Sequence, residues 1–254
     1  MASIAVLVIG APIVYLLSRA LKLVAEPPAV TKKRKEAVLA SLVYISAFVV
    51  VSAWQFFRRN VLLYPFPPPF DAVIVSFFAI FYAILLVPMI LAMKSTGQNI
   101  GSIGINMKNK GRMLALGFIL SVIFLAVSGF GAPSLGGGFA GFSSSLAYGF
   151  IAYAIVGFSE EAIFRGYIQT KLVAYGGPLK GLIVASFLFA FWHFPVVYFQ
   201  FSGVILEALA GTLMRLAPSL LDGYMMLRSQ NIIPSSIFHL FYDWSLLLWQ
   251  IPAV

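Results

Sequence analysis

The sequence of 254 residues contains no cysteine, only two histidines and few charges, since charged residues make up 10% of it. The absence of cysteine excludes disulfide bonds, thiolate metal ligands and a cysteine nucleophile, and leaves the redox compartment open. Soluble domains carry roughly 25% charged residues. Here 61% of the residues are hydrophobic and the mean hydropathy is +0.97, which predicts an integral membrane protein.

Long apolar runs separated by polar, proline or glycine breaks fill the chain. Because a helix needs about 20 apolar residues to cross a bilayer, these runs predict an all-α, polytopic membrane helix bundle with about eight transmembrane helices. The seventh run is interrupted by Pro218 and Asp222. We expect the spans near residues 3–23, 37–57, 72–93, 113–131, 144–170, 181–195, 203–226 and 231–250.

The net charge of +9 would suggest a nucleic-acid partner in a soluble chain, but here the basic residues follow the spans. They cluster at Lys32 to Lys35 after the first span and at Lys94 and Lys108 to Arg112 after the third. Of the loop cations, only Arg58 and Arg59 are expected on the opposite side. The positive-inside rule therefore predicts cation-rich loops in the cytoplasm and both termini outside, with the lipid bilayer and no nucleic acid as the environment of the chain.

Chemistry-bearing residues are distributed unevenly along the chain. We expect a single membrane domain over residues 1–254, in which residues 1–143 hold spans of uncertain role with almost no buried ionisable groups. Loops are expected at Tyr64 to Pro69 and at Gly136 to Gly138. Residues 144–250 place several ionisable side chains in or beside spans, where such groups usually mark function. We therefore expect a catalytic core over residues 144–250.

Two adjacent glutamates lie within the fifth predicted span. Glu161 and Arg165 are four residues apart, so they share a helix face and can pair, which is a structural role. Glu160 is rotated from Glu161 by about 100° on a helix and cannot easily reach the same arginine. With apolar helical neighbours, Glu160 is the free carboxylate and is suited to act as a general base or acid.

Both histidines of the chain also lie in apolar segments. His193 follows Phe189 by one helical turn, and Pro195 should end that helix just beyond it. His239 and Asp243 are four residues apart, so the imidazole and the carboxylate can touch and set each other's tautomer and charge. The alternatives are a hydrogen-bonded histidine at a helix end and a buried His–Asp pair that locks two spans.

A further possible pair lies in the seventh span. Arg215 and Asp222 are seven residues apart and share a face if Pro218 does not break the helix, which predicts a structural ion pair more strongly than a substrate contact.

Together, three fragments resemble the motifs of the CPBP family, the CAAX-processing and bacteriocin-processing (Abi-type) intramembrane proteases. That family carries Glu-Glu-x-x-x-Arg, Phe-x-x-x-His and His-x-x-x-Asn/Asp in this order. All three occur here in order and use both histidines of the chain. They are Glu160-Glu161-x-x-x-Arg165, Phe189-x-x-x-His193 and His239-x-x-x-Asp243.

The resemblance implies a mechanism. Glu160, helped by His193, would activate a water, and His239 with Asp243 would stabilise the oxyanion, while Glu161 and Arg165 support the motif helix. Asp243 would donate to the oxyanion only if protonated; otherwise it would orient His239 as an acceptor. The family is often described as metal-dependent, and Glu160, His193 and His239 could ligate zinc, although a metal-free carboxylate can also serve as the base.

The predicted function is an intramembrane endopeptidase that cleaves near the C-terminus of a membrane-associated protein or peptide. A prenylated Cys-a-a-X tail is one substrate that the family implies. Two other classes compete with this interpretation. One is a non-proteolytic membrane scaffold or bacteriocin self-immunity protein of the same fold, and the other is a proton-coupled transporter, which also places Glu, His and Asp at membrane depth.

Overall fold

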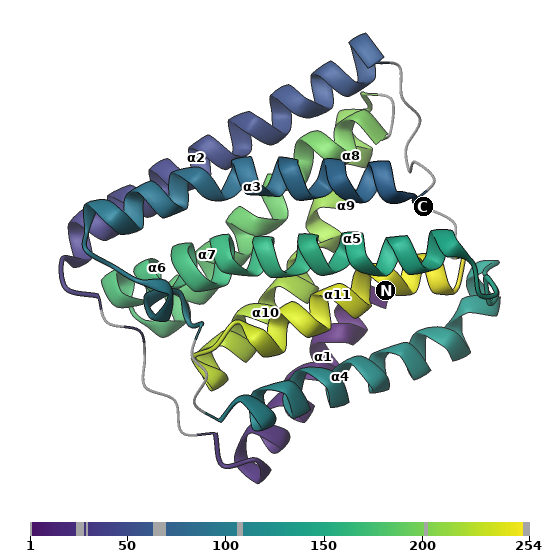
Figure 1. The fold of residues 1–254 in the computed structure, drawn as a ribbon. Coiled ribbons are helices and arrows are strands. Elements are labelled where there is room, and N and C mark those ends of the chain that lie inside the picture. The colour runs from purple at the N-terminus through teal and green to yellow at the C-terminus, as the bar shows by residue number, and fades with distance from the viewer. Residues whose placement is uncertain are drawn as a thin grey trace.

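The computed structural model describes residues 2–23, 28, 30–62, 70–105, 109–200 and 203–250. All regular elements in these ranges are helices, which confirms the predicted all-α class. Figure 1 shows them as a bundle in which the first half of the chain lies around the last helices. The predicted loop at Tyr64 to Pro69 and the cation Lys108 lie outside the described residues.

The first half of the chain contains four long helices and three short elements. The long helices are α1 (Ala2–Ala20), α2 (Lys33–Phe57), α3 (Ala72–Ser95) and α4 (Lys110–Gly131). The short elements are the π-helical turn η1 (Arg58–Leu62) and the 3₁₀ turns η2 (Ile100–Ile103) and η3 (Ala132–Leu135).

The second half begins with α5 (Ser144–Glu161), which continues without interruption through the π-helix η4 (Ala162–Gln169) into α6 (Thr170–Gly176). The helices α7 (Pro178–Trp192) and α8 (Phe194–Gln200) follow. The chain then forms α9 (Ile205–Met214), α10 (Leu216–Ser229) and α11 (Ile233–Leu248).

The helices form two layers. In one layer α2, α3, α5, α11 and α4 pack in that order, and in the other α7 packs on α6 and on α10, which also contacts α1. Figure 1 shows α5 and α11 side by side at the centre, with α2 and α3 to one side and α4 to the other. The π-helix η4 contacts α2, α7 and α10, so it joins the two layers. The second half of the chain therefore supplies the centre of the molecule.

Five helical segments of the described chain are long and apolar enough to cross a membrane, which supports a multi-pass membrane protein. The helices of the described chain roughly fit the predicted polytopic bundle of about eight spans, and some of the predicted spans form shorter helices. At about 1.5 Å per residue, even the 16-residue α11 is only about 24 Å long, less than the roughly 30 Å hydrocarbon core. The five segments are Lys33–Asn60, Ala72–Ser95, Lys110–Gly131, Ser144–Gly176 and Pro178–Gln200.

The prediction of one continuous seventh span over residues 203–226 was wrong. Pro218 has no N–H to donate to the carbonyl of Met214 four residues earlier, and α9 ends at Met214. A new helix, α10, then starts at Leu216 with Pro218 in its first turn, where a proline is tolerated. Pro195 acts in the same way on the preceding pair of helices, since α7 ends at Trp192 and α8 starts at Phe194.

The two ends of the bundle differ in charge. At one end, Arg112 donates to the carbonyl of Lys22 over 3.3 Å, and Lys171 pairs with Glu36. This end also carries the basic residues at the starts of α2 and α4, namely Lys33, Arg34, Lys35, Lys110 and Arg112. At the other end, the backbone of Gly138 donates to the carbonyl of Trp249 over 2.8 Å. Most loop cations therefore share one end, as the predicted topology requires, while the compartment that each end faces stays a prediction.

Candidate active site

The two glutamates of the first motif are the last residues of α5, where the helix changes from α to π geometry. All eight residues of η4, from Ala162 to Gln169, are buried. The hydroxyl of Thr170 donates to the carbonyl of Arg165, five residues earlier, over 3.2 Å. Runs of π-helix are rare and occur frequently at functional sites, because the wider turn re-aims side chains within one helix.

A glycine lets α5 and α11 approach closely next to these glutamates. A Cβ atom at Gly157 would lie 3.1 Å from the backbone nitrogen of Leu240 and 3.1 Å from the carbonyl oxygen of Ser236. Both atoms belong to α11, the helix that carries His239. The close packing therefore brings the imidazole of His239 against Glu160 and Glu161.

Glu161 and Arg165 form the predicted ion pair, with Glu161 Oε2 3.5 Å from Arg165 Nε. Both side chains are almost fully buried. Arg165 Nη2 also lies 3.4 Å from Asp222 Oδ2 and donates to the hydroxyl of Ser219 over 3.1 Å. The predicted pairing of Arg215 with Asp222 was therefore wrong, because Asp222 faces the buried Arg165 instead.

The two carboxylate oxygens of Glu160 have different surroundings: Oε1 accepts a hydrogen bond, whereas Oε2 only faces two imidazoles. The hydroxyl of Tyr82 donates to Glu160 Oε1 over 2.5 Å. Around Oε2, the Nε2 atoms of His239 and His193 lie 3.7 Å and 3.9 Å away. Within the described part of the chain, Glu160 Oε2 has no hydrogen-bond partner although Glu160 is only 2% exposed.

His193 stands at the junction between α7 and α8, with its Nδ1 atom 3.0 Å from the carbonyl oxygen of Phe189. Since a carbonyl only accepts, Nδ1 carries the proton, and the neutral ring has its lone pair on Nε2 facing Glu160. Phe189 also packs edge-on against His193, with 4.8 Å between the two ring centroids. The guanidinium carbon of Arg165 lies 4.1 Å from the ring centroid of Phe189. Phe189 of the second motif thus fixes the tautomer of His193 through its carbonyl and covers the charge of Arg165 with its ring.

His239 is surrounded by three carboxylates. Its Nδ1 atom lies 3.2 Å from Glu161 Oε1, and its Nε2 atom lies 3.4 Å from Asp243 Oδ2 as well as near Glu160. The side chain of Asp243 is 24% exposed and is the most accessible of the group. All the predicted site residues, from four different helical elements, are therefore brought together around two imidazoles.

Three contributors were not predicted from the sequence. Tyr82 comes from α3, in the half of the chain to which no chemical role was assigned, and Ser219 and Asp222 of α10 hold Arg165. A single tyrosine in an apolar span carries no spacing signal, so only the three-dimensional contact identifies it.

Two sets of residues could be considered as metal ligands. Glu161, Asp222 and His239 offer ligand atoms within 4.8 Å of one another, but the guanidinium of Arg165 already pairs with both carboxylates. In the set expected from the sequence, Glu160, His193 and His239, the Nε2 atoms of the two imidazoles lie 3.9 Å and 3.7 Å from Glu160 Oε2, but the set is less compact than Glu161, Asp222 and His239. Both imidazoles direct Nε2 at the unpaired oxygen of Glu160, and each has Nδ1 on an oxygen acceptor, as metal-bound histidines usually have.

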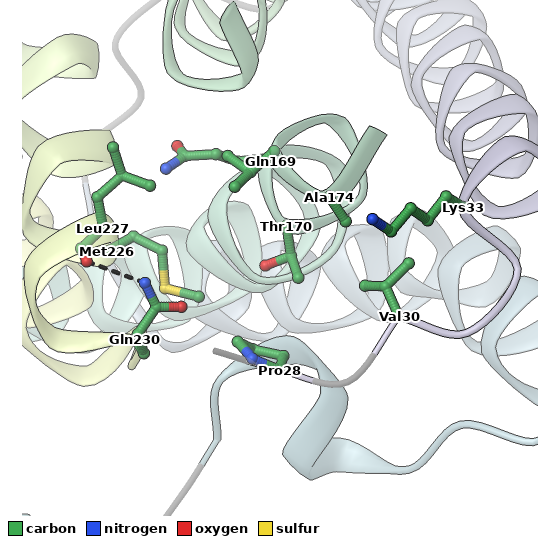
Figure 2. A pocket seen from close by; sticks show the side chains of 10 residues that line it. Pro28, Val30, Lys33, Gln169, Thr170, Ala174, Met226, Leu227 and Gln230 are labelled. Carbon is green, nitrogen blue, oxygen red and sulfur yellow. Dashed lines mark hydrogen bonds between the residues drawn. The ribbon is translucent and has the colours of Figure 1, made fainter. Parts of the chain in front are cut away.

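A separate pocket of about 240 Å³ lies at the cation-rich end of the bundle (Figure 2). Gln169 lines it and donates to the carbonyl of Gly223 over 2.8 Å. The pocket contains none of the predicted catalytic residues and so lies apart from the carboxylate–histidine cluster. Its lining comes from the segment before α2, the end of the motif helix and the end of α10, namely Pro28, Val30, Lys33, Gln169, Thr170, Val173, Ala174, Met226, Leu227 and Gln230.

Comparison with known proteins identifies the same part of the chain. The family model described as type II CAAX prenyl endopeptidase Rce1-like matches residues 142–245, which include all three motifs. No curated protein and no solved structure gives a significant match to this chain. The resemblance that the three motifs predicted is thereby confirmed. Residues 142–245 of this multi-pass membrane protein are therefore similar to the Rce1-like type II CAAX prenyl endopeptidases, which is consistent with a CPBP family intramembrane protease.

Proposed function

We propose that this protein hydrolyses a peptide bond near the C-terminus of a membrane-associated protein or peptide, using a water activated by Glu160. The observation that carries the proposal is the buried oxygen Glu160 Oε2, which has no hydrogen-bond partner in the described residues and is faced by the Nε2 atoms of His193 and His239. A buried carboxylate oxygen normally finds a donor, so this oxygen and the two imidazoles form a site for a molecule that carries protons.

In the proposed reaction a water donates to Glu160 Oε2 and attacks the carbonyl carbon of the peptide bond. Glu160 takes one proton of the water as the C–O bond forms and the carbonyl oxygen becomes an oxyanion. When the C–N bond breaks, this proton passes to the leaving nitrogen, and His193 Nε2 lies close enough to Glu160 to share in the transfer. The products are an amine and a carboxylic acid, which gives up the second proton of the water to the amine or to solvent and becomes a carboxylate, and the carboxylate of Glu160 is regenerated.

We assign stabilisation of the oxyanion to His239. Glu161 on Nδ1 and Asp243 beside Nε2 favour the positively charged imidazolium, whose N–H is a strong donor to developing negative charge. Because the side chain of Asp243 is partly exposed, we assign it the role of an anion that holds His239 in place. Glu161, Arg165 and Asp222 then act by positioning His239 and the motif helix.

The alternative to this metal-free reaction is one that uses zinc as a cofactor. If it binds, Glu160, His193 and His239 would hold it, and the ion would supply a polarised water and a Lewis acid for the carbonyl. Activity that survives dialysis against 1,10-phenanthroline would support the metal-free form, and activity restored only by added zinc would support the metal form.

The test of the function is cleavage of a peptide panel by purified protein. The panel contains farnesylated and unprenylated peptides that end in a Cys-a-a-X sequence, and mass spectrometry locates the cut. Glu160→Gln removes the base while keeping the shape, and the matched control Glu207→Gln changes an exposed carboxylate on α9. We expect cleavage by the wild type and by Glu207→Gln but not by Glu160→Gln. Cleavage that persists in folded Glu160→Gln protein would contradict the proposal, and a scaffold protein would cleave nothing.

We also propose that the cation-rich end faces the cytoplasm and that both termini lie outside. The gathering of the loop cations at one end supports this orientation through the positive-inside rule. Single cysteines introduced at Lys33 and Arg59, which are both exposed and belong to opposite ends of α2 and η1, can be labelled specifically because the chain has no cysteine of its own. An impermeant reagent applied to intact cells should label position 59 and not position 33, and the reverse pattern would contradict the orientation.

A further inference from the structure

Arg215 is a cation beside the candidate active site, and the proposed reaction assigns it no role. It separates α9 from α10, and its carbonyl accepts the first helical hydrogen bond of α10, from the backbone of Ser219 over 3.2 Å. Four and seven residues later on the same helix, Ser219 and Asp222 contact the buried Arg165. Positions separated by four and seven residues share one helix face, so Arg215 lies at the start of the face that borders the active site.

The guanidinium of Arg215 is poorly satisfied for its position. Its Nη1 atom donates to the carbonyl of Gly211 over 2.8 Å, and no carboxylate of the described residues lies within 4.0 Å of it. A guanidinium has five N–H donors, so most of its capacity is left. The residue is partly buried, where an unpaired charge is costly.

The charge of Arg215 nevertheless acts on the active site. It lies close enough to Asp243, Glu160 and His193 to interact with them electrostatically. Arg215 therefore lies near the reacting groups without being bound to any of their carboxylates. An arginine with free donors in this position is suited to bind a carboxylate of a ligand, because its planar fork matches two carboxylate oxygens.

We propose that Arg215 binds the C-terminal carboxylate of the substrate and thereby sets the distance from the chain end to the bond that is cleaved. This inference rests on the proposed function and names the feature of the substrate that the site recognises. Three extended residues span about 10 Å, so an arginine near but outside the reacting cluster suits a short tail that ends in a free carboxylate. Arg215 then determines specificity, while Glu160 performs the chemistry.

The experiment compares a peptide acid with the corresponding amide. The probes are two farnesylated peptides that end in Cys-Val-Ile-Met and differ only in a free or an amidated C-terminus. They are offered to the wild type, to Arg215→Gln and to the control Arg112→Gln, which removes an exposed arginine at the cation-rich end. For the wild type and the control we expect kcat/KM to be about 100-fold higher for the acid, as loss of a buried charged partner typically causes. In Arg215→Gln the ratio of the two kcat/KM values should fall to about one, because the acid loses its partner and the amide never had one.

Two results would overturn the inference. Wild-type protein that cleaves acid and amide equally would show that the carboxylate is not read. An equal loss for both peptides in Arg215→Gln would show that Arg215 only balances the charge of the site or supports the fold.

A binding measurement separates this inference from the proposed function. The fluorescently labelled peptides are titrated onto Glu160→Gln protein, which needs no turnover. Tighter binding of the acid, abolished when Arg215→Gln is added, supports the carboxylate site even if no peptide is cleaved. Equal Kd values for acid and amide would overturn it even if Glu160-dependent cleavage is found.

Discussion

Glu36 and Glu160 are both buried carboxylates in an apolar bundle, but their surroundings differ. Glu36 accepts from the backbone nitrogens of Thr31 and Lys32 over 3.1 Å and 3.0 Å through one oxygen. Its other oxygen accepts from the amide of Gln98 and lies 3.3 Å from the ammonium of Lys171. Every oxygen of Glu36 therefore has donors that belong to the protein, whereas Glu160 Oε2 faces two imidazoles and no donor within hydrogen-bond distance.

Under the proposed function, this difference distinguishes a buried carboxylate that stabilises the fold from one that takes part in the reaction. Because both carboxylate oxygens of Glu36 already have donors, a further ligand of this carboxylate would have to displace an existing bond. The Glu36 cluster thus ties the start of α2 to α6 at the cation-rich end. The Glu160 cluster keeps an acceptor free inside the molecule, which costs stability and is expected only where a ligand or a reaction repays the cost.

Among the residues that surround Glu160, the largest effect on activity should follow from His239→Gln. This change removes the cation that the three carboxylates Glu160, Glu161 and Asp243 surround, and with it the proposed donor to the oxyanion. We expect kcat to fall about 10³-fold, at the upper end for loss of one such donor. Turnover per folded molecule, with folding checked by gel filtration in detergent, measures the effect. A loss of less than tenfold would remove His239 from the reaction.

A smaller loss, about 10²-fold, is expected at Asp243. If Asp243 acts as an anion that holds His239, then Asp243→Asn and Asp243→Ala should lose activity alike, because neither supplies the charge. The asparagine variant is the informative one, since it keeps the size and offers a neutral donor. Near-normal turnover of Asp243→Asn would contradict the anionic role and assign a donor to this position.

Tyr82→Phe should reduce turnover by about tenfold. The substitution removes one hydrogen bond to Glu160 Oε1, worth about 1.5 kcal/mol when the acceptor is charged, and leaves the packing intact. Tyr44→Phe is the matched control, because Tyr44 is a tyrosine of α2 whose hydroxyl has no hydrogen-bond partner in the described chain. Equal activity of the two variants would show that Tyr82 does not act through Glu160.

The smallest effect on turnover should come from Glu36→Gln, because both oxygens of Glu36 are bound by donors of the protein itself. We expect kcat per folded molecule to stay within about twofold, because Glu36 contributes to the fold only. The free energy of unfolding should fall by about 3 to 5 kcal/mol, since Lys171 is left buried without its partner. Thermal unfolding and turnover measured on one preparation test both parts. A large loss of turnover in protein of normal stability would contradict the purely structural role of Glu36.

Helix positions and the residues of the candidate site could be predicted from the sequence because they follow local rules. Apolar runs indicate spans, and a spacing of four residues places Glu161 beside Arg165 and His239 beside Asp243, as found. Glu160 could be singled out because it has no arginine on its own helix face. These predictions need only the geometry of one helix.

Contacts between helices could not be predicted in the same way. The pairing of Asp222 with Arg165, the bond from Tyr82 to Glu160 and the bridge from His239 to Glu161 each join residues more than 50 positions apart. The helix break before Pro218 could not be predicted, because the sequence alone does not distinguish a proline in the first turn of a helix from one in its interior until the start of the helix is known. The π-helix also leaves no recognisable pattern in composition.

The most direct test of the central claim separates binding from chemistry at Glu160. Wild-type and Glu160→Gln protein are compared for the Kd of a farnesylated Cys-a-a-X peptide and for its cleavage in a single turnover with enzyme in excess. If Glu160 is the base, both proteins should bind the peptide with Kd values within about threefold, while the single-turnover rate of Glu160→Gln falls by 10³-fold or more, within the range of general-base and electrostatic contributions. A Glu160→Gln protein that binds the peptide and cleaves it at a rate within tenfold of the wild type would contradict the account.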